Sequence, residues 1–298
     1  MKNTTPLLPG FHLPTLRRKP RSASQKLAVQ RQQIRDKSIS QLGDCFGSFI
    51  PRCQLDHGAS GPFSRRRLFS KENTFWGFFS QVLDADGGCQ EVVRRFQAFA
   101  ATKGITAPSS STAGYCSARR KLDQTSLDTI LRHTTHELQQ HEKVDHWKGR
   151  RVVVVDGTGL SAPDTEANQQ AWPQPRNQKP GCGFPQLRLC ACFCLQTGAL
   201  LSHRIGSRKN HELPLIRQQW STFNSGDIFL GDKGFCSYYD VSHLRDQGVD
   251  SVITLARRKP VESSKATKVL GKDDLLIHWP KPQWNKALSY TRDEWLAL

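Results

Sequence analysis

The feature of the sequence that most constrains its fold is a run of four valines, residues 152–155, that leads directly into Asp156. β-Branched residues favour extended backbone, and an unbroken apolar run is typical of a strand buried on both faces of a sheet. A second, shorter strand is predicted over residues 227–231, and it leads into Asp232. The sequence therefore predicts two inner strands, each with an acidic residue at its end.

The elements around these two strands define an α/β layout. Two apolar segments that flank a Gln-Thr-Gly turn predict a β-hairpin, and two helical segments and a last apolar segment follow. We expect the hairpin strands over residues 187–195 and 199–205, helices over 211–223 and 238–247, and a final strand over 251–255. The order strand, strand, strand, helix, strand, helix, strand is that of the ribonuclease H-like fold, which is built on a mixed sheet.

In such a sheet the two aspartates come from the ends of neighbouring strands, so their carboxylates are expected to lie close together. Hard cations such as Mg²⁺ prefer carboxylate oxygens, and two such ions can clamp the attacking and leaving oxygens of a phosphodiester. Aspartate is also a common turn residue, but the position of both at strand ends favours the metal interpretation. We therefore expect Asp156 and Asp232 to be catalytic residues and metal ligands, with Mg²⁺ or Mn²⁺ as the cofactor.

Ahead of the sheet, apolar residues recur at helical spacing between residues 72 and 143, which predicts a small all-helical domain. Four prolines within the first 20 residues disfavour a helix at the start of the chain. We expect a basic flexible arm over residues 1–44, a helical DNA-binding domain over 45–146, and the ribonuclease H-like core over 147–260.

The charge of the chain favours a polyanionic partner. Its 43 Lys and Arg residues exceed its 26 Asp and Glu residues, which gives a net charge of +17, and nucleic acid is the commonest partner of such chains. Residues 1–80 alone hold 14 basic and four acidic side chains. A solvated surface is the alternative interpretation of any charge run. The candidate DNA contacts are Arg119, Arg120, Lys121, Lys233, Arg257 and Arg258.

Other classes of protein are disfavoured. No segment approaches the ~18 consecutive apolar residues of a spanning helix, so no membrane partner is expected. The first residues have no apolar export segment, and nine scattered cysteines suit a reducing compartment, which indicates a cytoplasmic protein. Cys190, Cys192 and Cys194 alternate along one predicted strand, and buried small apolar residues explain them better than a zinc site.

Four motifs resemble those of bacterial insertion-sequence transposases of the DDE type, in particular the IS-four family. Residues 153–161, VVVDGTGLS, resemble the first catalytic-aspartate motif, and residues 226–238, GDIFLGDKGFCSY, resemble the second. Residues 65–83 are similar to the N-terminal signature of the family, and residues 117–122 to a helical stretch ahead of its core.

The resemblance implies a nucleoid-associated bacterial enzyme of DNA transposition. Such enzymes bind the double-stranded ends of an insertion sequence, cleave there with a divalent metal, and join the freed end to target DNA. The resemblance also implies that the protein can form homo-oligomers on DNA. The resemblance further implies that residues 261–298 begin a β-rich insertion ahead of a third catalytic acid.

In the family that third acid follows a tyrosine and an arginine at fixed spacing. None of Tyr115, Tyr238, Tyr239 or Tyr290 has an arginine three positions on. The expectation is therefore a transposase truncated before its third acid and inactive as an isolated chain. The alternative is a non-catalytic fragment that binds DNA ends and competes with the full-length enzyme; an unrelated ribonuclease H-like nuclease fits the four motifs less well.

Overall fold

The protein is described from a computed structural model that covers residues 23–65, 67–84, 87–140, 146–175, 178–179, 181–208, 212–255, 266–271, 274–284 and 291–296. The chain divides into two compact units, residues 1–133 and residues 134–298. Among the described residues, none of the helices is both long enough and apolar enough to cross a membrane.

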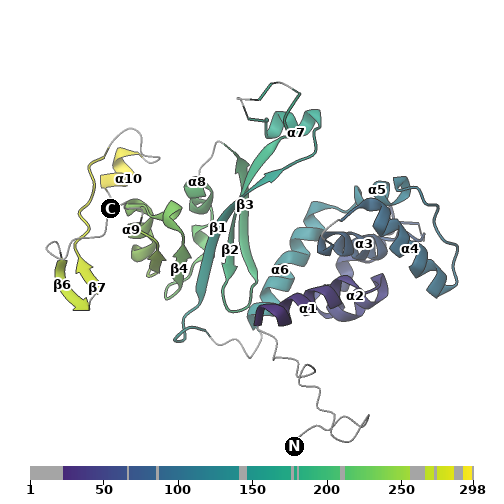
Figure 1. The fold of residues 1–298 in the computed structure, drawn as a ribbon, viewed down its shortest axis with the longest axis horizontal. Helices are drawn as coiled ribbons and strands as arrows, with labels where there is room; N and C mark the ends of the chain where they lie inside the picture. Colours follow the sequence, from purple (N-terminus) through teal and green to yellow (C-terminus); the bar gives the residue numbers. More distant parts are fainter. Residues whose placement is uncertain are drawn as a thin grey trace, which may run out of the picture. The chain divides into compact units, whose positions relative to one another are not determined.

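The first unit is helical, as predicted (Figure 1). Its helices are α1 (Ala23–Arg35), α2 (Ile39–Phe46), α3 (Lys71–Leu83), α4 (Cys89–Lys103), α5 (Ala113–Arg119) and α6 (Gln124–Gln140), the last of which continues into the second unit. Short 3-10 turns lie at Gly47–Phe49 and Arg52–Gln54. Ser70 caps α3 by accepting a hydrogen bond from the backbone N–H of Asn73 at 3.1 Å.

Aromatic side chains form the core of this unit. Phe96 is fully buried and meets Phe69 edge to face, with ring centroids 5.0 Å apart. Gly77 allows this packing, because a Cβ there would lie 2.6 Å from the Phe96 ring. Other buried members of the core are Ile39, Leu42, Phe75, Trp76, Val92, Val93, Tyr115 and Ile130.

Residues 23–46 differ from the expected flexible arm because they form α1 and α2. Ser38 and Gln41 form a capping box at the start of α2, and Ile39 and Leu42, three residues apart, are buried in the helical core. The prolines that disfavour a helix all lie within residues 1–22, which are outside the described residues.

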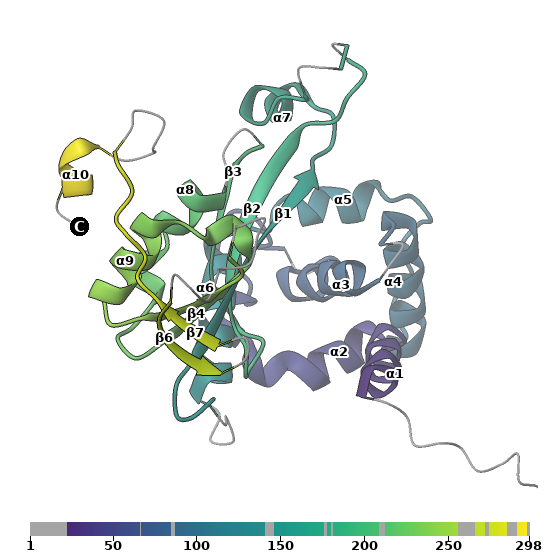
Figure 2. The same cartoon turned by 60° about the vertical axis from the view of Figure 1, so that its left-hand side comes forward.

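The second unit contains the mixed sheet (Figures 1 and 2). Its strands are β1 (Val152–Ser161), β2 (Gln186–Cys194), β3 (Leu200–Ser207), β4 (Ile228–Gly231) and β5 (Asp250–Ile253), in the spatial order β3-β2-β1-β4-β5. The pairs β1–β2 and β2–β3 are antiparallel, whereas β1–β4 and β4–β5 are parallel. This arrangement is the ribonuclease H-like fold, so the predicted fold class is confirmed.

Two helices, α8 (Glu212–Arg217) and α9 (Tyr238–Asp246), pack on the sheet: α8 contacts β2 and β3, and α9 contacts β5. The buried core that they share with the strands includes Val153, Val155, Cys190, Cys192, Leu215, Ile216, Phe229, Phe235 and Leu244. The valine run is thus part of a buried inner strand, as predicted.

The helix expected over residues 211–223 is shorter, because it ends at Arg217 and a 3-10 turn follows at Trp220–Thr222. The buried side chain of Gln219 explains the break. Its amide nitrogen donates to the carbonyls of Leu215 and Cys190, and its Oε1 accepts from Ser202. Interactions between elements therefore compete with helix continuation at this point. In addition, the long loop after β1 contains a short helix, α7 (Glu166–Ala171).

Beyond β5, strands β6 (Ala266–Gly271) and β7 (Asp274–Ile277) form a two-stranded antiparallel sheet, and α10 (Arg292–Leu296) follows. Trp295 of α10 is buried and packs against Tyr238 of α9, with ring centroids 5.8 Å apart. The strands agree with the β-rich character expected of residues 261–298; their assignment to an insertion stays a prediction.

Candidate active site

The strand register places Asp156 and Asp232 at neighbouring positions. Val155 of β1 pairs with Gly231 at the last paired position of the parallel β1–β4 ladder, and each aspartate is the next residue along its strand. Both aspartates are exposed. The carboxyl ends of parallel strands are the usual location of ligand sites in α/β sheets.

Each aspartate is oriented by the backbone that follows it. Asp156 Oδ1 accepts the N–H of Gly157 at 2.8 Å, and Asp232 Oδ1 accepts the N–H of Gly234 at 2.7 Å, which starts the 3-10 turn Lys233–Phe235. Within the described part of the chain, neither carboxylate forms a salt bridge. Both therefore keep oxygen atoms free for a cation.

A third carboxylate, that of Glu212, lies at the same edge of the sheet. Glu212 is the first residue of α8 and pairs with Arg188 of β2, whose Nη1 lies 3.1 Å from Oε1. Its carboxylate lies against Gly157 and approaches Gly234, the glycines that follow the two aspartates. The Nε of Arg188 is buried and has no hydrogen-bond partner among the described residues.

The buried thiol of Cys190 lies close enough to sense two of these carboxylates. Burial raises the pKa of Cys190 to about 12, and the negative charges of Glu212 and Asp156 add to the rise. Cys190 is therefore a neutral side chain of the core rather than a nucleophile. Cys192 and Cys194 are also buried, as the sequence predicts.

The donor set fits a hard divalent cation. Exposed carboxylate oxygens on adjacent strand ends are ligands that Mg²⁺ and Mn²⁺ prefer. In the parts of the chain that the structure describes, no group of three His, Cys, Asp or Glu side chains is already arranged to hold a metal ion. Asp156 and Asp232 offer two exposed carboxylates at this end of the sheet, and any further ligand has to approach them.

The predicted DNA contacts fall into three groups. Arg119 is engaged inside the helical unit, where its guanidinium donates to Gln81 at 2.9 Å and lies 5.8 Å from the centroid of the Tyr115 ring. Arg120 and Lys121 are exposed after α5, and Lys233 is exposed directly after Asp232. Arg257 and Arg258 lie outside the described residues.

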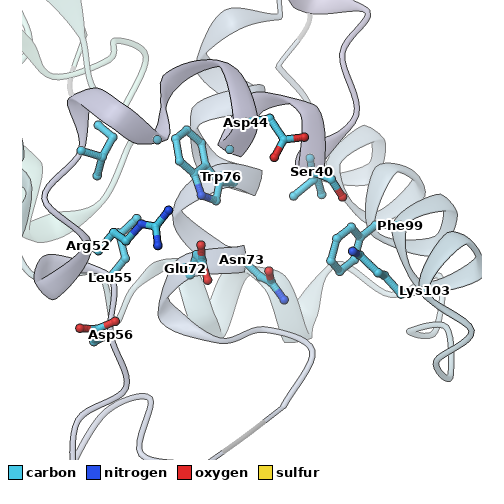
Figure 3. Close-up of a pocket in the computed structure, with 14 residues that line it drawn as sticks. Ser40, Asp44, Arg52, Leu55, Asp56, Glu72, Asn73, Trp76, Phe99 and Lys103 are labelled. Carbon is cyan, nitrogen blue, oxygen red and sulfur yellow. The ribbon is translucent and has the colours of Figure 1, made fainter.

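A hollow of about 520 Å³ lies within the helical unit, beside Trp76 (Figure 3). Its lining includes the carboxylates of Asp44, Asp56 and Glu72, which outnumber the basic side chains Arg52 and Lys103. This balance of charge disfavours a phosphate ligand, so the hollow is not the expected DNA site.

The fold and the paired strand-end aspartates define a ribonuclease H-like domain of the kind that can hold divalent cations for phosphodiester chemistry. Residues 147–294, which contain β1 to β7 and all three carboxylates, match the model of the transposase DDE domain. The chain therefore carries a DDE transposase domain and belongs to the DDE transposases.

Among solved structures, the chain is similar to one described as Mos1 transposase paired-end complex with left transposon end. The identity is 10%, the match covers 79% of this chain and 74% of the other, and the TM-score is 0.23. The search of curated proteins returns no match. Membership of the IS-four family stays a prediction.

The sequence singled out Asp156 and Asp232, which the strand register makes neighbours, but it did not single out Glu212 or Arg188. The available signals were weak. Glu212 lies in the first turn of a predicted helix, where acidic residues are common because they interact favourably with the helix dipole. Arg188 is a single charged residue in an otherwise apolar predicted strand. Neither position by itself indicates a functional site.

Proposed function

We propose that this protein binds the ends of an insertion sequence and catalyses metal-dependent DNA cleavage and strand transfer, with Asp156 and Asp232 as the catalytic metal ligands. The observation that carries the proposal is the β1–β4 register, which makes the two aspartates neighbours inside the segment that matches the DDE domain.

The chain's own residues have separable tasks in this reaction. Asp156 and Asp232 hold the cation at the exposed edge of the sheet, and the rigid β1–β4 ladder fixes the separation of their backbones. When bound, the cation supplies Lewis acidity and orients the phosphodiester. Lys233, exposed next to Asp232, is positioned to bind a phosphate of the DNA backbone.

Cleavage can be tested with a supercoiled plasmid that carries the gene together with its flanking genomic DNA. We expect nicking in Mg²⁺ or Mn²⁺, reduced at least ~100-fold in D156N and in D232N, because each loses charge that stabilises the transition state. The matched control is D164N, which changes an exposed aspartate in the loop after β1. Nicking that persists in D156N and D232N would overturn the assignment of the site.

DNA binding is expected to depend on exposed basic residues of the helical unit. Each phosphate contact contributes about 0.9 to the slope of log affinity against log salt. The double variant R120A/K121A should therefore bind duplex DNA more weakly and lower that slope by up to about 2. The control R94A/K103A removes the same charge from α4. Equal slopes in both variants would contradict this assignment; salt-dependent binding without nicking would support the non-catalytic DNA-end-binding alternative.

A further inference from the structure

The carboxylate of Glu212 occupies space that two glycines leave open beside the aspartates. A Cβ on Gly157 would lie 2.4 Å from Glu212 Oε1 and 2.5 Å from its Cδ. A Cβ on Gly234 would lie 3.5 Å from Glu212 Oε2 and 2.9 Å from Asp232 Oδ1. One oxygen from α8 and one from the end of β4 therefore approach the same point next to Gly234.

Arg188 determines which oxygen of Glu212 is available. The guanidinium binds Oε1 at 3.1 Å, in an ion pair whose side chains are only 30% and 24% exposed. The oxygen that approaches Gly234 and Asp232 is the other one, Oε2. The ion pair through Oε1 therefore leaves Oε2 directed toward Gly234 and Asp232.

The requirement for glycine differs along β1. A Cβ on Gly159 would have nothing within 4 Å. A Cβ on Gly157 would overlap Glu212, because it would lie 2.4 Å from Oε1. The Glu212 carboxylate therefore requires a glycine at position 157, directly after Asp156, whereas position 159 has no such requirement.

We propose that Glu212 supplies a third carboxylate when a cation binds at Asp156 and Asp232, and that its ion pair with Arg188 keeps it beside them. The proposal rests on the proposed function of this site and deepens it. A third carboxylate adds a hard, negatively charged oxygen, which strengthens the binding of Mg²⁺ or Mn²⁺. Glu212 lies between the two aspartates in the sequence, so it is distinct from the third acid that the family resemblance implies.

Binding of Mn²⁺ alone, followed by electron paramagnetic resonance on the full chain without DNA, tests the proposal. E212Q removes the charge and nearly keeps the shape of the side chain, and we expect its Kd for Mn²⁺ to rise at least ~10-fold, the scale at which residues of a metal site act. E166Q, at the exposed start of α7, is the matched control and should bind as the wild type does.

A second pair of variants leaves every charge in place. G157A should weaken Mn²⁺ binding because its Cβ displaces Glu212, whereas G159A should not. If E212Q fails to fold, as judged by circular dichroism, this glycine pair decides the question. In an E212Q background, G157A should produce little further loss, since both changes act on the same carboxylate.

The outcomes separate this proposal from the proposed function. If D156N and D232N lose Mn²⁺ binding while E212Q and G157A match the wild type, Glu212 is not a ligand and the aspartate site stands. If D156N and D232N also bind Mn²⁺ as the wild type does, the cation site itself is refuted, and the role of Glu212 with it.

Discussion

Breaking the ion pair between Arg151 and Asp227 by removal of one partner should strongly destabilise the sheet. Arg151 precedes β1 and Asp227 precedes β4, so the pair joins the two parallel strands at the end opposite the aspartates. The side chains are only 15% and 7% exposed, and Arg151 Nε donates to Asp227 Oδ1 at 3.1 Å. Asp227 also accepts the backbone N–H of Asn224 at 2.8 Å.

The variant D227A leaves the Arg151 guanidinium buried without its counter-charge, and removing one partner of such a pair costs about 3–5 kcal/mol. Arg151 keeps hydrogen bonds to Thr222 and Gln139, at 2.9 and 3.3 Å, so we expect the lower end, about 3 kcal/mol. That is a large share of the roughly 5–15 kcal/mol that stabilises an ordinary domain.

Urea denaturation followed by circular dichroism measures the change in the free energy of unfolding. D246A is the control, because Asp246 pairs with Arg245 at 3.3 Å on the surface, where the side chains are 57% and 71% exposed and such pairs contribute at most about 1 kcal/mol. The double variant R151M/D227A should be more stable than D227A, since no charge is then left buried alone. Equal losses in D227A and D246A would refute this reasoning.

Two further predictions concern the two cores. G77A should lower the free energy of unfolding by about 1–3 kcal/mol, because its Cβ would meet the buried ring of Phe96 at 2.6 Å, while G47A, with nothing within 4 Å, should be neutral in the same urea titration. Burial raises the pKa of Cys190 to about 12 and that of Cys192 to about 11, so their contribution to stability is complete below the ordinary thiol pKa near 9 and is lost as the pH rises toward those values. Unfolding free energies measured between pH 8 and 10.5 should fall, less steeply in C192A; a flat profile would contradict this.

Much of the fold follows from local pattern. The valine run predicts β1, and the apolar spacing between residues 72 and 143 predicts a helical unit, in which α4 ends where Gly104 adopts a left-handed φ of 64°. These signals are readable because each depends on a few consecutive residues: β-branching, helical periodicity and the conformational freedom of glycine.

Patterns were less informative where distant residues decide the local structure. The helix α2 is stabilised by burial of Ile39 and Leu42 in a core made largely by α3 and α4. The helix α8 ends early because the Gln219 side chain bonds residues of β2 and β3. In both cases tertiary contacts override local propensity.

The sequence by itself determined the order of the elements, the basic character of the chain and the two aspartates at strand ends. Only the tertiary structure decided that Glu212 and Arg188 lie beside those aspartates and that Arg119 is engaged within the helical core. The reason is physical. The order of the elements along the chain follows from short-range patterns. The position of a side chain such as Glu212 depends instead on how α8 packs on β2 and on which glycines leave space for it. These contacts join residues that are far apart in the chain.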